Sequence, residues 1–223
     1  MATSGTTTFT LQIDDIIDEA LDRCGGEVTW GQEPRSARRS LNLLLTEWSN
    51  RGINLWTVEQ DSIAVSASAG ASIALDQDVV DIMDMVVAAS DGSDLGMTRI
   101  GYVDWLRIPN KEQVGRPTQW FVERQRDQPV LRTWPLAEDN FTFKFWKIKR
   151  IQDIKQSFED PDVPYRFLPA LTAGLAYYMS LKRSVPLDRV AVLKAQYEEA
   201  LLYASQEDRE RVSFKAIPKI PRV

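Results

Sequence analysis

Residues 40–56, SLNLLLTEWSNRGINLW, decide the fold class because they contain a helix, its end and the start of an extended segment. The apolar residues of one helix face follow at spacings of three and four: Leu41, Leu44, Leu45 and Trp48. Gly52 supplies the left-handed backbone that often ends a helix, and residues 53–56 then change to an extended pattern. The sequence therefore predicts a helix that ends at Gly52 and a sheet that begins after it.

Helical periodicity recurs on both sides of this stretch. A first helix, at about 11–24, ends at a glycine pair and has these inward positions: Ile13, Ile16, Ile17, Ala20, Leu21 and Cys24. The helix that includes residues 40–52 begins near Pro34 and also turns Ala37 inward. A third helix, at about 165–183, is apolar nearly all round, as expected of a central helix. Pro186 separates it from a fourth, whose apolar stripe is Val190, Leu193, Tyr197, Ala200, Leu201 and Ala204.

Between residues 53 and 151 the helical period is absent, and short apolar runs alternate with turn signals. In the clearest strand, 141–148, Phe143 and Phe145 share one face, whereas Trp146 and Ile148 take the opposite phase. A bulge or two-sided burial near 145–146 would explain that switch. A short helix around Trp105 is also predicted. The predicted class is α+β, with a β-rich domain inserted into a discontinuous α-helical bundle made from the N- and C-terminal helices.

This organisation divides the chain into four parts: a flexible N-terminus at 1–9, a helical bundle domain from 10–52 and 160–212, an inserted β-rich domain at 53–151, and an extended C-terminal arm at 213–223. After Glu210 no acidic residue remains, and two prolines interrupt the basic end. Such an arm can dock along the acidic groove of a partner, although a merely disordered end has the same composition.

Composition excludes several kinds of chemistry. The 223 residues are 43% hydrophobic and 26% charged, and they include no histidine. A Ser-His or Cys-His nucleophilic pair, an imidazole proton shuttle and a His-based zinc site are therefore impossible. The single cysteine, Cys24, excludes an intramolecular disulfide and is expected to be a buried structural thiol. No nucleotide-binding glycine loop is present, so we expect no catalytic, cofactor-binding or metal-binding residues and no cofactor.

Charge and hydropathy indicate a soluble protein. The net charge of −5 argues against a broad phosphate-neutralising surface. The N-terminus lacks the features of a signal peptide, and the longest nearly apolar run, 168–179, is far shorter than the ~20 residues that span a bilayer. We expect a chain that starts in the cytoplasm and has no membrane partner.

Two groups of carboxylates are the candidates for acid-base chemistry. Asp14, Asp15, Asp18 and Glu19 belong to the first helix, and Glu159, Asp160 and Asp162 precede the third. A pair at a defined separation would be needed for cleavage of a glycan, as in a cell-wall hydrolase of the virion. Solvated helix faces and helix-start electrostatics are the favoured interpretation.

Basic and aromatic residues are the candidates for binding. Arg35, Arg38 and Arg39 open the second helix and superficially resemble a DNA-reading helix, but the preceding turn at 25–33 is too long for that motif. A partner-facing or solvated patch is the favoured interpretation. Trp120, Trp134 and Trp146 could stack single-stranded bases or serve an unrelated protein-binding module, yet aromatic residues on strands are more often core.

Several phrases of the chain resemble head-to-tail adaptor proteins of short-tailed bacteriophages, the packaged-DNA stabilisation or tail tubular A-like proteins. They are IDDIIDEALDRCG at 13–25, LNLLLTEWSNRGINLW at 41–56, GRPTQWFVERQ at 115–125, TWP at 133–135, the 160–183 segment beginning DPDVPYRF, and LLYASQEDRE at 201–210. These segments are characteristic of the fold, and none is a catalytic signature.

The resemblance implies a structural protein of the podovirus virion, assembled in the host cytoplasm and located at the head-tail junction. It implies a dodecameric ring of this chain beneath the portal protein, bound below to a tail tube or nozzle protein, that helps in DNA retention and DNA ejection. Packaged double-stranded DNA would pass through the lumen without sequence-specific binding. Because the C-terminal arm commonly engages the portal in such families, the expected portal-binding residues are Lys215, Ile217, Lys219, Ile220 and Arg222.

Overall fold

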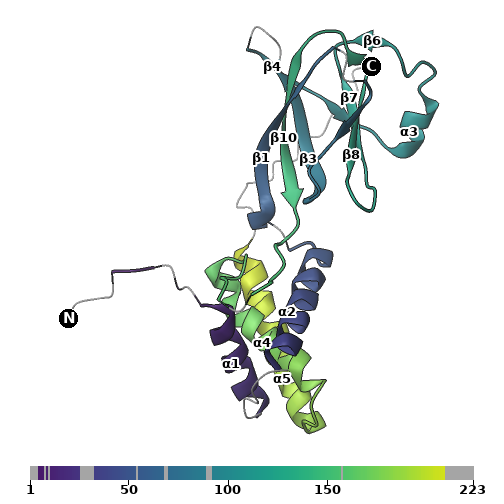
Figure 1. The fold of residues 1–223 in the computed structure, drawn as a ribbon. Helices are drawn as coiled ribbons and strands as arrows, with labels where there is room; N and C mark the ends of the chain where they lie inside the picture. The colour runs from purple at the N-terminus through teal and green to yellow at the C-terminus, as the bar shows by residue number, and fades with distance from the viewer. Residues whose placement is uncertain are drawn as a thin grey trace, which may run out of the picture. The chain divides into compact units, whose positions relative to one another are not determined.

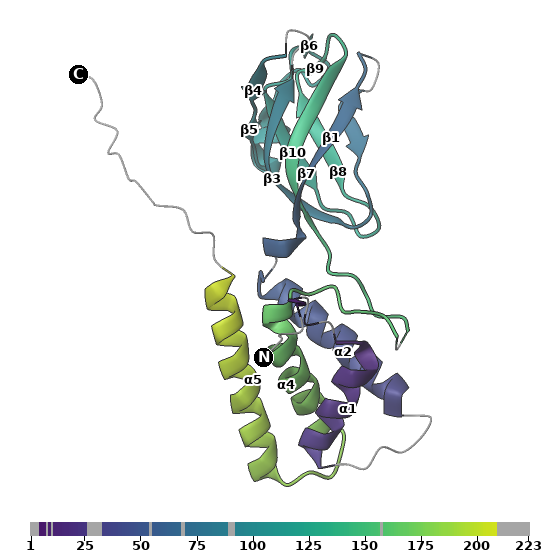
Figure 2. The ribbon, with the colours of Figure 1, turned by 90° about the vertical axis from the view of Figure 1, so that its left-hand side faces the viewer.

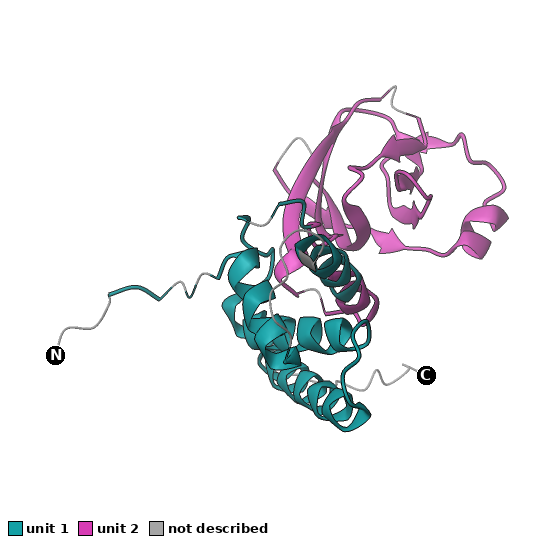
Figure 3. Cartoon of the chain, turned by 60° about the horizontal axis from the view of Figure 1, so that its bottom comes forward, with its two compact units in different colours: residues 1–44, 154–223 teal, residues 45–153 magenta. Residues whose placement is uncertain are grey.

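The computed structural model describes residues 5–7, 9, 11–25, 33–53, 55–67, 70–88, 92–156 and 158–208. Within this part of the chain, five α-helices and ten strands form two compact units (Figure 1). One unit is made from residues 1–44 and 154–223, and the other from residues 45–153 (Figure 3). The predicted mixed α+β class is confirmed.

Helix α1, Ile13–Cys24, buries the six residues that the periodicity predicted. At its start the backbone N–H of Gln12 donates to Asp15 Oδ2 at 3.2 Å, and at its end Gly25 takes the left-handed conformation with φ 71°. The thiol of Cys24 is buried and donates to the carbonyl of Ala176 at 2.9 Å. Burial raises the pKa of Cys24, which makes it the inert structural cysteine that the sequence predicted.

Helix α2, Glu33–Asn50, also has the predicted inner face, which is buried at Ala37, Leu41, Leu44, Leu45 and Trp48. Gly52 follows it with φ 75°, and the N–H of Ile53 closes the turn onto the carbonyl of Trp48 at 3.2 Å. The predicted extended start at 53–56 is wrong in one detail. A 3₁₀ turn, Leu55–Thr57, comes first, and strand β1 begins at Val58.

Helix α4, Leu168–Ser180, is the predicted central helix, with a short 3₁₀ turn, Tyr165–Phe167, in place of its expected first residues. Helix α5, Leu187–Glu207, follows Pro186 and buries Leu193, Tyr197, Leu201 and Ala204. Figure 2 shows α4 between α5 and the other two helices of this unit. A Cβ on Gly174 would lie 2.8 Å from Leu44 Cδ2 and 2.9 Å from Tyr197 Cε2. Glycine therefore allows α2 and α5 to approach α4 closely.

The second unit consists of sheets that share one core. Strands β1 Val58–Val65, β10 Phe141–Lys149, β3 Val79–Ala88 and β4 Asp94–Gly96 form the first sheet in that order. Strands β2 Ser72–Ala74, β8 Val130–Trp134, β7 Gln119–Glu123 and β5 Thr98–Arg99 form the second, and β6 Val114–Gly115 pairs with β9 Leu136–Ala137. Phe143 of the first sheet and Trp120 of the second belong to the same buried cluster, which joins the two sheets. The predicted helix around Trp105 is confirmed as α3, Tyr102–Arg107.

Strand β10 contains the predicted irregularity in an unexpected form. Its register against β3 shifts between Trp146 and Lys147, because Trp146 faces Asp84 whereas Lys147 faces Ile82. The additional residue, Met83, lies on β3, so the alternation along β10 continues without a change of phase. As a result Lys147, at 5% exposure, continues the buried face of Phe143 and Phe145.

The predicted core role of the three tryptophans is only partly correct. Trp120 is completely buried. Trp134 is half-buried and donates its indole N–H to the carbonyl of Asn110 at 2.9 Å. For Trp146 the prediction is wrong, because 48% of this residue is exposed on the outer face of β10. Among the helices that the structure describes, none has both the length and the apolar character of a membrane span.

Candidate partner-binding site

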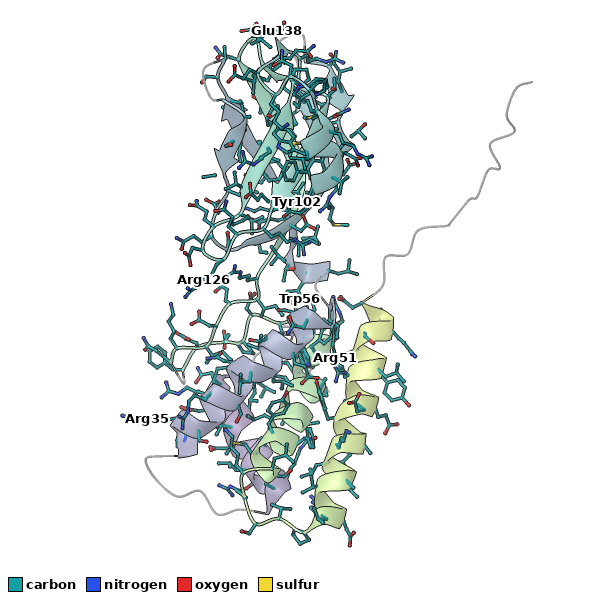
Figure 4. The ribbon with its side chains drawn as sticks, turned by 90° about the vertical axis from the view of Figure 1, so that its right-hand side faces the viewer. Arg35, Arg51, Trp56, Tyr102, Arg126 and Glu138 are labelled. Atoms are coloured by element: carbon teal, nitrogen blue, oxygen red, sulfur yellow. The ribbon has the colours of Figure 1, made fainter. Side chains whose placement is uncertain are left out.

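The first turns of α2 present a basic face. Arg35, Arg38, Arg39 and Asn42 follow at spacings of three and four residues, which brings their side chains to one side of the helix. Arg35 and Arg39 are exposed and have no hydrogen bond or ion pair within the described part of the chain. Figure 4 shows Arg35 projecting from the N-terminal end of α2, away from the other helices. The two arginines are therefore free to meet a partner.

The segment that returns from the β unit is fastened to the same face. The side-chain amide of Asn42 donates to the carbonyl of Ile154 at 3.1 Å and accepts the N–H of Ile154 at 2.9 Å. Arg38 Nη1 donates to the carbonyl of Lys155 at 2.6 Å. Glu159 then accepts the N–H groups of Lys155 and Gln156, each at 3.0 Å. These contacts fix the backbone around Ile154 against α2 without using Arg35 or Arg39.

A pocket of about 550 Å³ lies between the helix and this segment. Its lining residues are Arg35, Arg38, Arg39, Asn42, Ile154 and Lys155. Four of the six lining residues are cations and none is a carboxylate, so the pocket has the sign that attracts an anion. Arginine in particular offers several N–H donors in a planar arrangement that matches carboxylate and phosphate.

Two observations show that this positive charge is incompletely compensated. Arg38 Nε is buried and has no hydrogen-bond partner among the described residues. Nearby, Lys182 donates to Ser40 Oγ at 2.6 Å. The pKa of Lys182 is lowered by burial and further by the positive charge of Arg39. An anion in the pocket would offset the repulsion between these cations.

The arginine patch thus differs from a simple solvated face. Arg35 and Arg39 are exposed as a partner-facing patch requires, whereas Arg38 is half-buried and holds the 154–156 segment. The predicted portal-binding residues Lys215, Ile217, Lys219, Ile220 and Arg222 lie outside the described residues, as does most of the predicted N-terminal segment 1–9.

Three of the carboxylate candidates, Asp15, Glu19 and Glu159, have structural partners. Asp15 caps α1, and Glu19 forms an ion pair with Arg23 at 2.8 Å. Hydrogen bonds from Gln156 and Lys155 lower the pKa of Glu159, which disfavours the protonated form that a general acid needs. Asp160 borders a pocket of about 70 Å³ beside Tyr165. Within the described residues no group of three or more acidic or cysteine side chains is arranged to hold a metal ion.

Two charged clusters in the β unit were not predicted from the sequence. Lys147 donates to Asp61 at 2.6 Å and pairs with Glu59 at 3.2 Å, and Lys149 pairs with the same Glu59 at 2.6 Å. Hydrogen bonding from Lys147 lowers the pKa of Asp61. The one feature of the sequence that indicated this cluster is the position of Lys147, which lies on the same strand face as Phe143 and Phe145.

The second cluster surrounds Asp81, which accepts two hydrogen bonds from Arg99 at 2.9 Å and a third from Arg124. Burial alone would raise the pKa of Asp81, but the hydrogen bonds from Arg99 and Arg124 reverse the direction and lower it. Arg99 also lies over the Trp120 ring, 5.2 Å from its centroid. The first cluster connects the neighbouring strands β1 and β10, and the second connects β3 of the first sheet to β5 of the second, so we assign both to the stability of the β unit.

Comparison with known proteins gives a family match over most of the chain. The sequence model of the family described as SU10 adaptor protein matches residues 11–217. None of the curated proteins matches the chain. A chain from the solved neck of an empty GTA particle, computed with C6 symmetry, is similar over 88% of this chain and 93% of that chain. Its sequence identity is 10% and its TM-score 0.29, a likeness too weak to support an inference about function.

Proposed function

The chain belongs to the family of SU10 adaptor proteins, and on this premise we propose that it is a structural head-to-tail adaptor of a bacteriophage virion. The observation that supports this proposal is the extent of the family match, which includes the helices of both chain ends and the whole β unit. In this role the copies form a ring beneath the portal protein, and the ring connects the portal to the tail tube or nozzle protein.

The proposed architecture is a discontinuous helical bundle with an inserted β-rich domain. Contacts within the helical unit favour it, because Cys24 of α1 bonds to the backbone of α4, and Leu44 of α2 lies against Gly174 of the same helix. Helices from both ends of the chain therefore share one core, as a ring subunit needs for a rigid base. The arm at 213–223 is proposed to bind the portal.

The charge of the chain is compatible with passage of DNA. Packaged DNA is strongly negative, and a net charge of −5 does not favour tight binding to its phosphates. We propose that double-stranded DNA passes the ring without sequence-specific contacts, and that the closed ring helps to retain the genome until ejection. We further propose that the virion is short-tailed and that the protein assembles in the host cytoplasm.

Binding to purified portal rings tests the proposal. The full-length chain is mixed with portal rings of the phage that encodes it and sedimented at moderate salt. We expect the chain to sediment with the rings in a fixed ratio, and electron microscopy should show added density on one face of the ring. A chain that stays in the supernatant at every salt concentration and ratio would contradict the adaptor role.

A further inference from the structure

Helix α1 presents a row of acidic side chains that nothing within the described chain compensates. Asp14, Asp18 and Asp22 follow at intervals of four residues and are all exposed. None of the three carboxylates has a hydrogen bond or ion pair with a described residue. Like charges four residues apart destabilise a helix by about 0.2–0.5 kcal/mol per pair. This acidic row therefore lowers the stability of the isolated subunit.

Helix α2 instead carries positive charge that has no ion pair within the described residues. Arg35 and Arg39 are also four residues apart and unpaired within the described residues. They lie in the first turns of the helix, where the helix dipole disfavours positive charge. Arg38, which lines the same pocket, adds a buried Nε donor that has no hydrogen-bond partner among the described residues. The basic pocket thus favours an anion, and the acidic row favours a cation.

We propose that the basic pocket of α2 receives the acidic row of α1 from a second copy of this chain. At a rise of about 1.5 Å per residue, the carboxylates of the row are about 6 Å apart along α1, and Arg35 and Arg39 have the same spacing along α2. One contact between copies therefore pairs both sets of charges. The inference rests on the proposed ring and names the surfaces that join its subunits.

The contacts within one copy explain why the proposed contact is between copies. Among the described residues, neither the three carboxylates of the row nor Arg35 and Arg39 form an ion pair within their own chain. Each copy instead offers the row to one neighbour and the pocket to the other. Such a head-to-tail contact uses two different surfaces and generates a ring where the rotation closes. DNA phosphates would satisfy the pocket but would leave the acidic row unpaired.

Site-directed crosslinking of full-length chains tests the contact. One variant has Asp18→Cys, the other Arg39→Cys, and the two are mixed and treated with a short bismaleimide. We expect a crosslinked pair of chains, which grows weaker as salt rises because the contact is electrostatic. A matched control replaces Arg39→Cys by Glu199→Cys on the exposed side of α5, and it should give little product. An absent Asp18–Arg39 product, or one no stronger than the control, would overturn the proposal.

Charge reversal gives a second readout. Arg35→Glu with Arg39→Glu makes both faces acidic, whereas Asp18→Lys with Asp22→Lys makes both basic. Each single-face variant should lose association with copies of itself, and a mixture of the two variants should recover it. All four positions are exposed, and each change removes an unfavourable charge interaction within its own helix, so the thermal midpoints should not fall below that of the wild type. Association of a single-face variant at the wild-type level would show that the contact lies elsewhere.

Two further measurements separate this inference from the proposed function. If crosslinking succeeds but the wild-type chain does not sediment with portal rings, the contact between copies stands and the adaptor role fails. If the Arg35→Glu, Arg39→Glu variant loses binding to a short DNA duplex while self-association is unchanged, the pocket binds DNA phosphates and the contact between copies is wrong.

Discussion

Trp48 is completely buried on the inner face of α2, although it lies only two residues before the end of that helix. Replacing it with alanine removes the largest side chain of this face and leaves a cavity. We expect Trp48→Ala to lower the free energy of unfolding by about 3–5 kcal/mol. The midpoint of chemical denaturation measures the change.

The matched control lies on the same helix. Leu43 is 59% exposed, so Leu43→Ala should change the free energy of unfolding by less than about 0.5 kcal/mol. Equal effects of the two substitutions would show that Trp48 is not part of the core.

Residues at fixed helical spacing were predictable, but two neighbours on β10 were not. Periodicity identified all six buried positions of α1 and the five buried apolar positions of α2, although not the buried Ser40. On β10 the aromatic side chain of Trp146 faces outward while the ammonium group of Lys147 faces inward. Hydrophobicity alone predicts the reverse. The acidic residues that make Lys147 tolerable, Asp61 and Glu59, lie more than 80 positions earlier, and only the pairing of β1 with β10 brings them together.

At the level of elements, the pair of strands β1 and β10 depends on this cluster. Lys147→Met keeps the volume but removes the hydrogen bond that lowers the pKa of Asp61. The pKa of Glu59 is lowered mainly by Lys149 and further by Lys147, so it changes less. A carboxylate whose pKa is lowered in the folded state stabilises the protein above its unfolded pKa, and this contribution is lost as the pH falls. We expect Lys147→Met to destabilise the chain by about 1–3 kcal/mol at pH 7.

Denaturation at two pH values checks this prediction. The difference between wild type and Lys147→Met should shrink as the pH falls below about 4, because the unfolded chain protonates these carboxylates before the folded chain does. Lys149→Met, at the exposed end of the cluster, is the control and should have a smaller effect at pH 7. A difference that is the same at pH 7 and pH 3 would mean that packing, and not charge, explains the effect.

The packing of helices in the first unit depends on Gly174. Alanine at this position would push its Cβ into Leu44 and Tyr197, which belong to α2 and α5. Such overpacking costs about 1–3 kcal/mol, from which the better helix propensity of alanine subtracts up to about 1 kcal/mol. We expect Gly174→Ala to lower the thermal midpoint. Gly96→Ala, where a Cβ meets nothing within 4 Å, should leave it nearly unchanged; a stabilised Gly174→Ala chain would refute the close approach.

Elements differed in how far the sequence could define them. Helices α1 and α2 have long amphipathic patterns and glycine ends, so their limits were predicted within a few residues. Strands β5, β6 and β9 have two residues each, and parallel pairing connects β5 to β7 and β6 to β9. Segments so short have no periodicity, and their partners are set by contacts distant in the sequence. The basic pocket was predictable as an arginine patch, but its second wall, residues 154–155, was not.

For the molecule as a whole, enzymatic activity on the cell wall is the alternative with the clearest test. Glu159 is committed to backbone hydrogen bonds, and the chain has no histidine. We expect purified protein incubated with peptidoglycan to release no reducing ends. Release that disappears on replacement of Glu159, Asp160 or Asp162 would establish a hydrolase and contradict the structural role.

The portal attachment proposed for the intact protein depends on the arm at 213–223. The arm lies outside the described residues, and its sequence carries no strong periodic apolar face. Deleting 213–223 should therefore leave the thermal midpoint unchanged and severely weaken sedimentation with portal rings. The deletion separates attachment from folding, because a loss of binding at an unchanged midpoint cannot come from unfolded protein.

The arm's composition predicts how attachment divides between charge and apolar contact. Loss of Ile217 and Ile220 together should remove apolar anchoring at any salt concentration. Single replacement of Lys215, Lys219 or Arg222 by glutamine should weaken binding modestly and reduce its dependence on salt, since each removes one screened charge. Cosedimentation across a salt series measures both effects. Undiminished binding of the deleted chain would move the portal interface elsewhere, with the Arg35, Arg38 and Arg39 patch as the next surface to test.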